Sequence, residues 1–547
     1  MKSSTAACIL AVSHLSLALA SPLGEQFIFK NYDDDRAAAS SIKTSNDGNE
    51  DGPEHDFNVY HHLSGISPFF DSHGPRPEPP EGCVITSASI LARHSSITMN
   101  DDEFPETIGP FLSKLKKYKK HQKKKEGKKG KKGKKHHAWG ESLGFLEHWK
   151  TPVNEDNMEQ LTGPGARDAK KLGATLANHY EQLVPGRDEP AIKIYTASSQ
   201  RDVDSSTAFI TGMFPNRTLG TSQGQVDLVK VPNKNEDWSF SLTPHKVCDR
   251  FDKSQGKKER NAYQEVVAKK AIQRLTEKGE LPGWKWNWTD IIAMQQMCGY
   301  ESVIRDSSEF CKVFTEEEWL EFEYGQDLYY YHMLGRHRKW TAALGIPWIQ
   351  IAASNLKKTR TQHVIVPPVV PKPTHGLFDI LKKNKAEKAS STTTSSSFEL
   401  PKPTQGPNAT LPQAFHIWFT HREEVPLVTH ALDLYHGHDE ATGAMPLDKV
   451  NPTRVWKTSE IIPFLGHVSL ERMECAAAGA DKKEGDDGEV QAHPYVRIIV
   501  NGSPQEQPSC HDGPGGSCPL HQFLELVDDL PSIYGELKEV CQQTEED

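Results

Sequence analysis

Short apolar runs rich in β-branched residues alternate along this chain with longer stretches in which apolar positions recur at helical spacing. The short runs predict four buried strands, at residues 84–92, 192–197, 414–420 and 495–500. The longer stretches predict four helices, at residues 104–115, 166–180, 205–214 and 425–435. Because strands and helices alternate, the pattern favours an α/β fold built on one sheet.

Residues 232–344 follow a different pattern. They contain no convincing strand, and helical periodicity, tryptophan and charge are concentrated there. We predict that this stretch forms a helical cap inserted into an α/β domain, and that the domain is built from residues 58–231 and 345–547.

Polar tracts precede and interrupt these elements. Residues 21–57 predict an acidic, flexible lead, residues 382–407 a Ser/Thr/Pro linker and residues 477–489 a further polar loop. A lysine-rich tract covers about residues 114–137 and holds fourteen lysines. Because like charges repel, we expect an extended surface insertion there. A funnel for polyanions is the functional alternative, and an insertion of no strong function is favoured over it.

The N-terminus predicts a secretory signal peptide over residues 1–20. Lys2 gives a weakly basic start, residues 8–17 are mostly apolar, and Ala18-Leu19-Ala20 fits a small-x-small cleavage site. No other run approaches the length of a membrane span. We therefore expect a secreted chain.

Secretion changes the interpretation of the cysteines, because an even number in an oxidising route implies disulfides. Eight cysteines remain after the predicted cleavage. Spacing makes Cys298–Cys311 and Cys510–Cys518 plausible local loops, and the other four would have to pair over long distances. None has the CxxC spacing of a zinc site, so metal binding is the weaker interpretation of these cysteines.

Four Asn-x-Ser/Thr sequons fit the same route and predict glycosylation, at Asn216, Asn287, Asn408 and Asn501. The formal charge of −10 and the pI near 6.2 argue against a general nucleic-acid binder.

Polar side chains follow three of the predicted strands. Arg93-His94 end the first strand, Arg201 follows the second, and residues 421–424 follow the third. Carboxyl ends of parallel strands meet at one edge of a sheet, and helix N-termini at that edge add N–H donors for an anion. The pattern therefore predicts a single anion site.

The residue types at these strand ends suit phosphoryl transfer. His94 would attack phosphorus and form a phosphohistidine. The phosphoryl oxygens would be held by three cationic side chains, Arg93, Arg201 and His421. Glu423, with Glu424 as the alternative, would protonate the leaving alkoxide and then activate water.

Each of these residues also has a plainer interpretation. Arg201 would pair with Asp202 or Asp204, His421 would cap a helix, and residues 423–424 would be first-turn acids that complement the helix dipole. For single residues these alternatives are favoured. The joint order of the three motifs favours the functional interpretation.

The same motifs resemble a known family. Residues 92–98 (ARHSSIT) resemble the RHGxRxP motif of the histidine acid phosphatases, the phytase-like branch of the histidine phosphatase superfamily. His421-Arg422-Glu423 is similar to the later His-Asp of that family and to the His-Ala-Glu of multiple inositol polyphosphate phosphatases. Further similar segments lie at residues 327–331, 344–348, 456–459, 463–466 and 510–520.

The resemblance implies a fold and an activity. The fold is a mixed, mostly parallel α/β sheet flanked by helices, as in phosphoglycerate mutases, with an inserted helical cap and the site between the two parts. The activity is that of a secreted acid phosphatase, acting without cofactor on small phosphomonoesters such as phytate and other inositol phosphates. The implied disulfides are Cys83–Cys475, Cys248–Cys541, Cys298–Cys311 and Cys510–Cys518.

Three positions depart from the family motif. Ser95 replaces a glycine, Ile97 stands where the family has a second phosphate-binding arginine, and Asn100 or a neighbour replaces the motif proline. Losing one bidentate arginine should reduce the rate by roughly 10²–10³. We hypothesise that Arg422 supplies the missing charge. The alternative function is a catalytically impaired member that binds phosphorylated or polyanionic ligands.

Overall fold

The computed structural model describes residues 57–71, 78–128, 139–234, 236–358, 413–437, 440–476 and 492–543. The predicted signal peptide, the acidic lead up to residue 56, the linker at 382–407 and the polar loop at 477–489 lie outside these residues, as does the sequon at Asn408. Within them, no helix is both long and apolar enough to cross a membrane.

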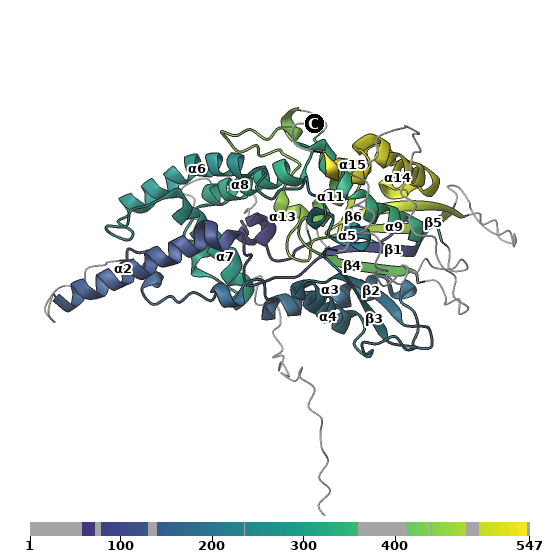
Figure 1. The fold of residues 1–547 in the computed structure, drawn as a ribbon, viewed down its shortest axis with the longest axis horizontal. Helices are drawn as coiled ribbons and strands as arrows, with labels where there is room; N and C mark the ends of the chain where they lie inside the picture. The colour runs from purple at the N-terminus through teal and green to yellow at the C-terminus, as the bar shows by residue number, and fades with distance from the viewer. Residues whose placement is uncertain are drawn as a thin grey trace, which may run out of the picture.

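The described residues form one central sheet of eight strands in the order β3-β2-β4-β1-β5-β6-β7, with β8 beside β6 (Figure 1). The strands are β1 (Cys83–Arg93), β2 (Ile192–Ala197), β3 (Val226–Val231), β4 (Phe415–Thr420), β5 (His467–Ala476), β6 (Ala492–Val500), β7 (Ser503–Gln505) and β8 (Cys518–Pro519). β1, β2, β4 and β6 contain the four strands that the sequence predicts.

The sheet is mixed, as the resemblance implies, but parallel pairing is confined to β3-β2-β4-β1. β5 pairs antiparallel with β1 and β6, and β7 and β8 pair antiparallel with β6. The hydrophobic pattern misses β5 because buried charges interrupt it. Glu471 of β5 is fully buried, with its Oε2 2.6 Å from Nη2 of Arg497 in β6.

Thirteen helices of the α type lie in the described residues: α2 (Gly109–Lys128), α3 (Gly163–His179), α4 (Gln200–Met213), α5 (Glu236–Leu242), α6 (Lys257–Glu277), α7 (Trp288–Arg305), α8 (Glu316–Leu334), α9 (Ile346–Leu356), α11 (Glu424–Ala431), α12 (Glu440–Gly443), α13 (Thr458–Ile461), α14 (Leu520–Tyr534) and α15 (Leu537–Gln542).

Helices cover both faces of the sheet (Figure 1). α3 and α4 lie on one face, where Leu172 packs in the same buried cluster as Ile90 of β1. α9 and α14 lie on the other face, where Ile349 packs with Leu91 of the same strand. Consecutive residues of β1 therefore enter different cores, as expected because strand side chains alternate between the two faces.

Residues 236–344 contain α5 to α8 and short 3-10 turns, and no strand, and they include most of the stretch that the sequence predicts as a cap. α6 packs against α7 and α8 around a separate buried cluster. Figure 1 shows this helical layer beside the end of the sheet where β1 and β4 finish.

The lysine-rich tract contains a helix, so the expectation of an extended insertion over 114–137 is wrong for its first part. α2 continues to Lys128, and Leu115, Tyr118 and Gln122 are buried along one side of it. The apolar stripe of the preceding residues thus extends into the tract, and lysine is a good helix former on the outer side. Residues 129–137 lie outside the described residues.

The structure contains four disulfides, at Cys83–Cys475, Cys248–Cys541, Cys298–Cys311 and Cys510–Cys518. This is the pairing that the resemblance implies. The first bond joins β1 to β5 at directly opposed positions of the sheet.

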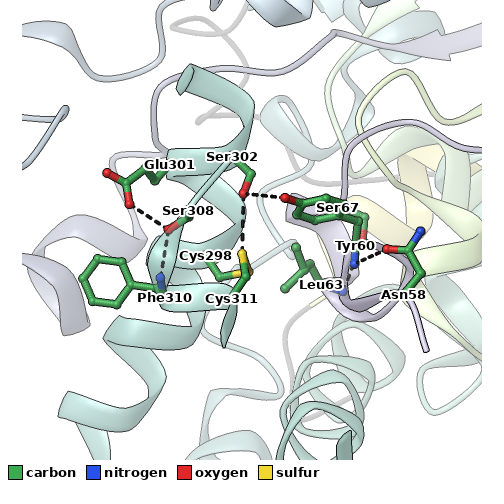
Figure 2. The surroundings of a disulfide bond; sticks show 10 residues. All are labelled: Asn58, Tyr60, Leu63, Ser67, Cys298, Glu301, Ser302, Ser308, Phe310 and Cys311. Carbon is green, nitrogen blue, oxygen red and sulfur yellow. Dashed lines mark hydrogen bonds between the residues drawn. A yellow bond between two sulfur atoms is a disulfide. The ribbon is translucent and has the colours of Figure 1, made fainter. Parts of the chain in front are cut away.

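The Cys298–Cys311 bond lies where α7 meets the N-terminal segment of the described chain (Figure 2). Ser302 of α7 lies 3.5 Å from the Cys311 sulfur and 3.4 Å from the Tyr60 hydroxyl. The N-terminal segment is therefore held against the cap before it continues toward the sheet.

The structure contradicts glycosylation at Asn501. Its side chain is fully buried, and Nδ2 donates hydrogen bonds to the carbonyl oxygens of Glu460 and Ile461 at 2.6 and 3.1 Å. Oδ1 accepts a hydrogen bond from the amide of His467 at 2.7 Å. A glycan on Nδ2 would break these bonds. Asn216 and Asn287 are exposed.

Candidate active site

Three adjacent strands end at one edge of the sheet and bring the predicted site residues together. β4 lies between β2 and β1, and the amide of His94 donates to the carbonyl of Thr420 at 2.8 Å. Arg93 ends β1, His421 follows β4, and Arg201 lies in the first turn of α4 after β2.

His94 is held in one orientation. It is 2% exposed, and its Nδ1 donates to the carbonyl of Ser95 at 2.9 Å, which leaves Nε2 as the ring nitrogen with a free lone pair. Burial, and next the charges of Arg93 and Arg201, hold the pKa of His94 well below its usual value. The imidazole is therefore neutral in mildly acidic solution, as a nucleophile requires.

Arg93 is fully buried, and only part of its guanidinium is bonded to protein. Nη1 donates to the carbonyls of Gly65 and Ile462 at 2.6 and 2.7 Å, and the guanidinium lies 4.4 Å from the ring centre of Phe464. Nε and Nη2 have no hydrogen-bond partner in the described protein. Two donors of this buried cation thus remain for an anion.

The turn that supplies the Gly65 carbonyl is anchored on both sides. This turn, η2 (Ser64–Ile66), follows the segment held at the Cys298–Cys311 corner. The amide of Ser64 donates to Ser459 Oγ at 2.8 Å, and the carbonyl of Ser67 accepts from the amide of Phe464 at 2.9 Å. The position of Arg93 therefore depends on this turn and on residues 459–464 as well as on the sheet.

Arg201 and His421 meet at the second and third strand ends. Arg201 Nη2 lies 3.4 Å from His421 Nδ1, and Arg201 Nη1 lies 2.8 Å from Glu159 Oε2. His421 Nδ1 also lies 3.0 Å from Asp202 Oδ2, and both of these side chains are almost fully buried. Asp202 thus faces His421, and the expected alternative of an Arg201–Asp202 pair is replaced by Arg201–Glu159.

Two of the three departures from the family motif, Ser95 and Ile97, have different surroundings. Ser95 Oγ donates to the carbonyl of Gly165 at 2.7 Å, so its side chain is accommodated at the start of α3. Ile97 is fully buried in the cap-side cluster and forms a bridge with Leu161. The position of the family's second arginine is therefore part of an apolar core.

Arg422 is nine-tenths buried or more and is surrounded by acidic groups. Its Nη1 lies 2.9 Å from Glu103 Oε1, its Nη2 3.3 Å from Asp102 Oδ2 and its Nε 3.5 Å from Glu423 Oε1. After burial, Arg422 is the largest cause that lowers the pKa of Arg93 to about 10. The two guanidinium groups therefore act on one region of the site.

Glu423 and Glu424 each face a basic partner from the cap. Glu423 Oε1 lies 2.8 Å from Lys253 Nζ, and Glu424 is hydrogen-bonded to His245 Nδ1. Burial opposes ionisation of Glu423, but Lys253, His245 and Arg422 outweigh it and hold the pKa of Glu423 well below its usual value. Glu424 lies in the first turn of α11, as expected for a first-turn acid. His421 precedes this helix.

Sequence reasoning missed the partners of the proposed site residues, namely Asp102, Glu103, Glu159, His245 and Lys253. These residues carry no motif, and they lie far along the chain from the side chains that they contact. The sequence indicated a partner only where Asp202 adjoins Arg201. That prediction was wrong, because Asp202 contacts His421.

His245, Glu423 and Glu424 could supply three metal-ligand atoms within 4.8 Å of one another. Lys253 already lies against Glu423, and His245 is bonded to Glu424. A metal ion would have to displace the lysine, so the donors fit a network of protein charges better than a metal centre.

Comparison with known proteins places these residues in context. Residues 110–501 match the sequence profile of the histidine phosphatase superfamily, branch 2. A thiamine-repressible acid phosphatase of Schizosaccharomyces pombe is 24% identical over 89% of this chain and 91% of its own length. Phytase A of Aspergillus oryzae is 24% identical over 86% of this chain and 88% of its own length.

Solved structures show the same fold. The phytase from D. castellii superposes with a TM-score of 0.67 at 17% identity, covering 93% of this chain and 94% of that one. The multiple inositol polyphosphate phosphatase of Bifidobacterium longum, in complex with phosphate, gives a TM-score of 0.54 at 12% identity, covering 87% of this chain and 98% of that one.

Proposed function

This chain belongs to branch 2 of the histidine phosphatase superfamily and is a phosphomonoesterase, and we propose that it acts as a secreted acid phosphatase through a phosphohistidine at His94. The observation that carries the proposal is the orientation of His94. Its Nδ1 is bonded to the Ser95 carbonyl, and the charges of Arg93 and Arg201 act on the ring.

In the first step, Nε2 of His94 attacks phosphorus, an N–P bond forms and the ester P–O bond breaks. Nε and Nη2 of Arg93 supply free N–H donors for the phosphoryl oxygens, and Arg201 and His421, which lie side by side at the neighbouring strand ends, hold the same group. The leaving alkoxide takes a proton from Glu423.

In the second step, Glu423 accepts a proton from water as the water attacks phosphorus, the N–P bond breaks and inorganic phosphate leaves. The carboxyl is then protonated again for the next cycle. Glu423 is preferred over Glu424, because Glu424 is bonded to His245 and Glu423 contacts Arg422 of the phosphate site.

Donation by Glu423 requires that its pKa rise when substrate binds. A bound phosphoryl group attracts Lys253 and Arg422, the cations that hold the free carboxylate ionised. Because these cations then share their charge with the phosphoryl group, Glu423 takes up a proton more readily. Acidic solution favours this step, in agreement with an acid phosphatase.

Secretion is supported by the sequence of residues 1–20 and by the four disulfides, which form in oxidising compartments. The substrate in this proposal is a small phosphomonoester.

Trapping the intermediate tests the proposal. The protein is mixed with 4-nitrophenyl phosphate at acidic pH, quenched in alkali within the first turnovers, digested and analysed by mass spectrometry. We expect phosphate on His94, stable in alkali and lost in acid, and none on protein quenched before substrate is added. Steady phosphate release without a modified His94 would contradict the intermediate, and no release from either this ester or phytate would contradict the activity.

The pH profile of a Lys253 variant tests the assignment of Glu423. The Lys253→Met change removes the cation 2.8 Å from the carboxylate, so the pKa of Glu423 should rise by about one unit or more. The donor then keeps its proton to higher pH, and the alkaline limb of the kcat profile should move upward.

The control for this profile is Lys270→Met, because Lys270 pairs with Glu317 and Glu321 on the outside of the cap. Its pH profile should match that of the unmodified protein. An alkaline limb that stays in place or moves downward in Lys253→Met would show that Glu423 is not the proton donor.

A further inference from the structure

The most exposed acidic groups of the site are Glu159 and Asp102. Their side chains are 34% and 37% exposed, whereas Arg93, His94 and His421 are 2% exposed or less. Glu159 pairs with Arg201 at 2.8 Å, and Asp102 lies 3.3 Å from Arg422. These two carboxylates form what we call the acidic rim, since they lie on the solvent side of the arginines that they contact.

Glu159 is held in this place by an unusual backbone conformation. Its φ is +60°, in the left-handed region that non-glycine residues rarely adopt. Its amide donates to the carbonyl of Met99 at 2.8 Å, and the next residue, Gln160, accepts from the amide of Thr98 at 2.9 Å. The segment after His94 thus fixes a disfavoured conformation that directs a carboxylate to Arg201, and such conformations concentrate at functional sites.

In the described site, few cations remain free to bind the additional phosphates of a substrate that carries several. Arg201, Arg422 and Lys253 each already face a carboxylate, and the free donors of Arg93 serve the phosphoryl group that reacts. Lys246 lies within electrostatic reach of Arg201, because after burial Arg201 is the main cause that lowers its pKa. Lys253 lies 3.9 Å from Asp102 and contacts Glu423 more closely, at 2.8 Å.

We propose that Glu159 and Asp102 determine specificity by favouring phosphomonoesters with an uncharged leaving group over inositol polyphosphates. The proposal rests on the proposed function of the same site. When a single phosphoryl group binds, it replaces Glu159 as the anionic partner of Arg201 and Asp102 as the anionic partner of Arg422. The remaining phosphates of an inositol polyphosphate stay near the rim, where like charges repel them.

The test compares kcat/KM for phytate and for 4-nitrophenyl phosphate at low ionic strength in Glu159→Gln, Asp102→Asn and the double variant. We expect the unmodified protein to prefer the aryl phosphate. Each substitution should raise the phytate-to-aryl ratio about three- to tenfold, and added salt should reduce that gain. The control is Glu155→Gln, an exposed residue of the same loop in the turn η5 (Glu155–Asn157), which should leave the ratio unchanged.

A preference of the unmodified protein for phytate, or rim variants with the same ratio as Glu155→Gln, would overturn the proposal while the phosphatase activity stands. Calorimetric titration of phytate into His94→Ala protein, with and without the rim substitutions, gives a readout that needs no turnover. Affinity for phytate should rise about three- to tenfold when both rim charges are removed. An unchanged affinity for phytate would contradict the role proposed for the acidic rim, even if no variant released phosphate.

Discussion

Replacing His94 by alanine should reduce kcat for 4-nitrophenyl phosphate by a factor on the order of 10⁴ or more, the scale seen when a catalytic nucleophile is removed. The ring of His94 is oriented by a backbone carbonyl and lies in the field of Arg93 and Arg201. The neighbouring Arg93, Arg201 and His421 would still bind phosphate, so the loss should appear in kcat rather than in KM.

Steady-state phosphate release measures this loss, and the inhibition constant for inorganic phosphate shows whether the variant keeps its binding site. His148→Ala is a suitable control, because that side chain is 88% exposed and should leave kcat unchanged. Residual turnover within tenfold of the unmodified protein would exclude His94 as the nucleophile. Tight phosphate binding by an inactive unmodified protein would instead identify an impaired member of the family.

The sequence predicts the strand ends of the site well because their positions follow from local patterns. Apolar runs locate β1, β2 and β4, and parallel pairing then brings Arg93, Arg201 and His421 to one edge. No packing detail is needed for this step, since the carboxyl ends of neighbouring parallel strands must lie together.

The partners of those residues depend on tertiary packing and could not be predicted. Lys253 reaches Glu423 from a loop between α5 and α6, and Glu159 reaches Arg201 from a turn between β1 and β2. Hydrophobic periodicity carries no information on such contacts. The buried Glu471 misleads it further, because a charged residue in the core strand β5 resembles one in a solvent-exposed segment.

Ile97, which stands where the family has an arginine, shows the same limit of prediction from sequence. A substitution of arginine by isoleucine suggests a weakened phosphate site, but Ile97 packs in the cap-side core and Arg422 approaches the site from another strand end. Whether Arg422 replaces the missing arginine stays a prediction, and the contacts of Arg422 with Glu103, Asp102 and Glu423 could not be predicted from its place in the sequence.

Arg422→Ala should lower kcat/KM for 4-nitrophenyl phosphate by roughly 10²–10³, about as severely as Arg201→Ala. In the described site, Arg422 contacts the carboxylates of Glu103, Asp102 and Glu423, and Lys253 contacts two of them. Without Arg422, these carboxylates would repel the phosphoryl group. Arg422→Lys should recover part of the activity, because it restores charge without the two-pronged donor. Thermal unfolding of each variant separates this effect from loss of the fold. Near-normal turnover in folded Arg422→Ala protein would show that Arg422 does not replace the missing arginine.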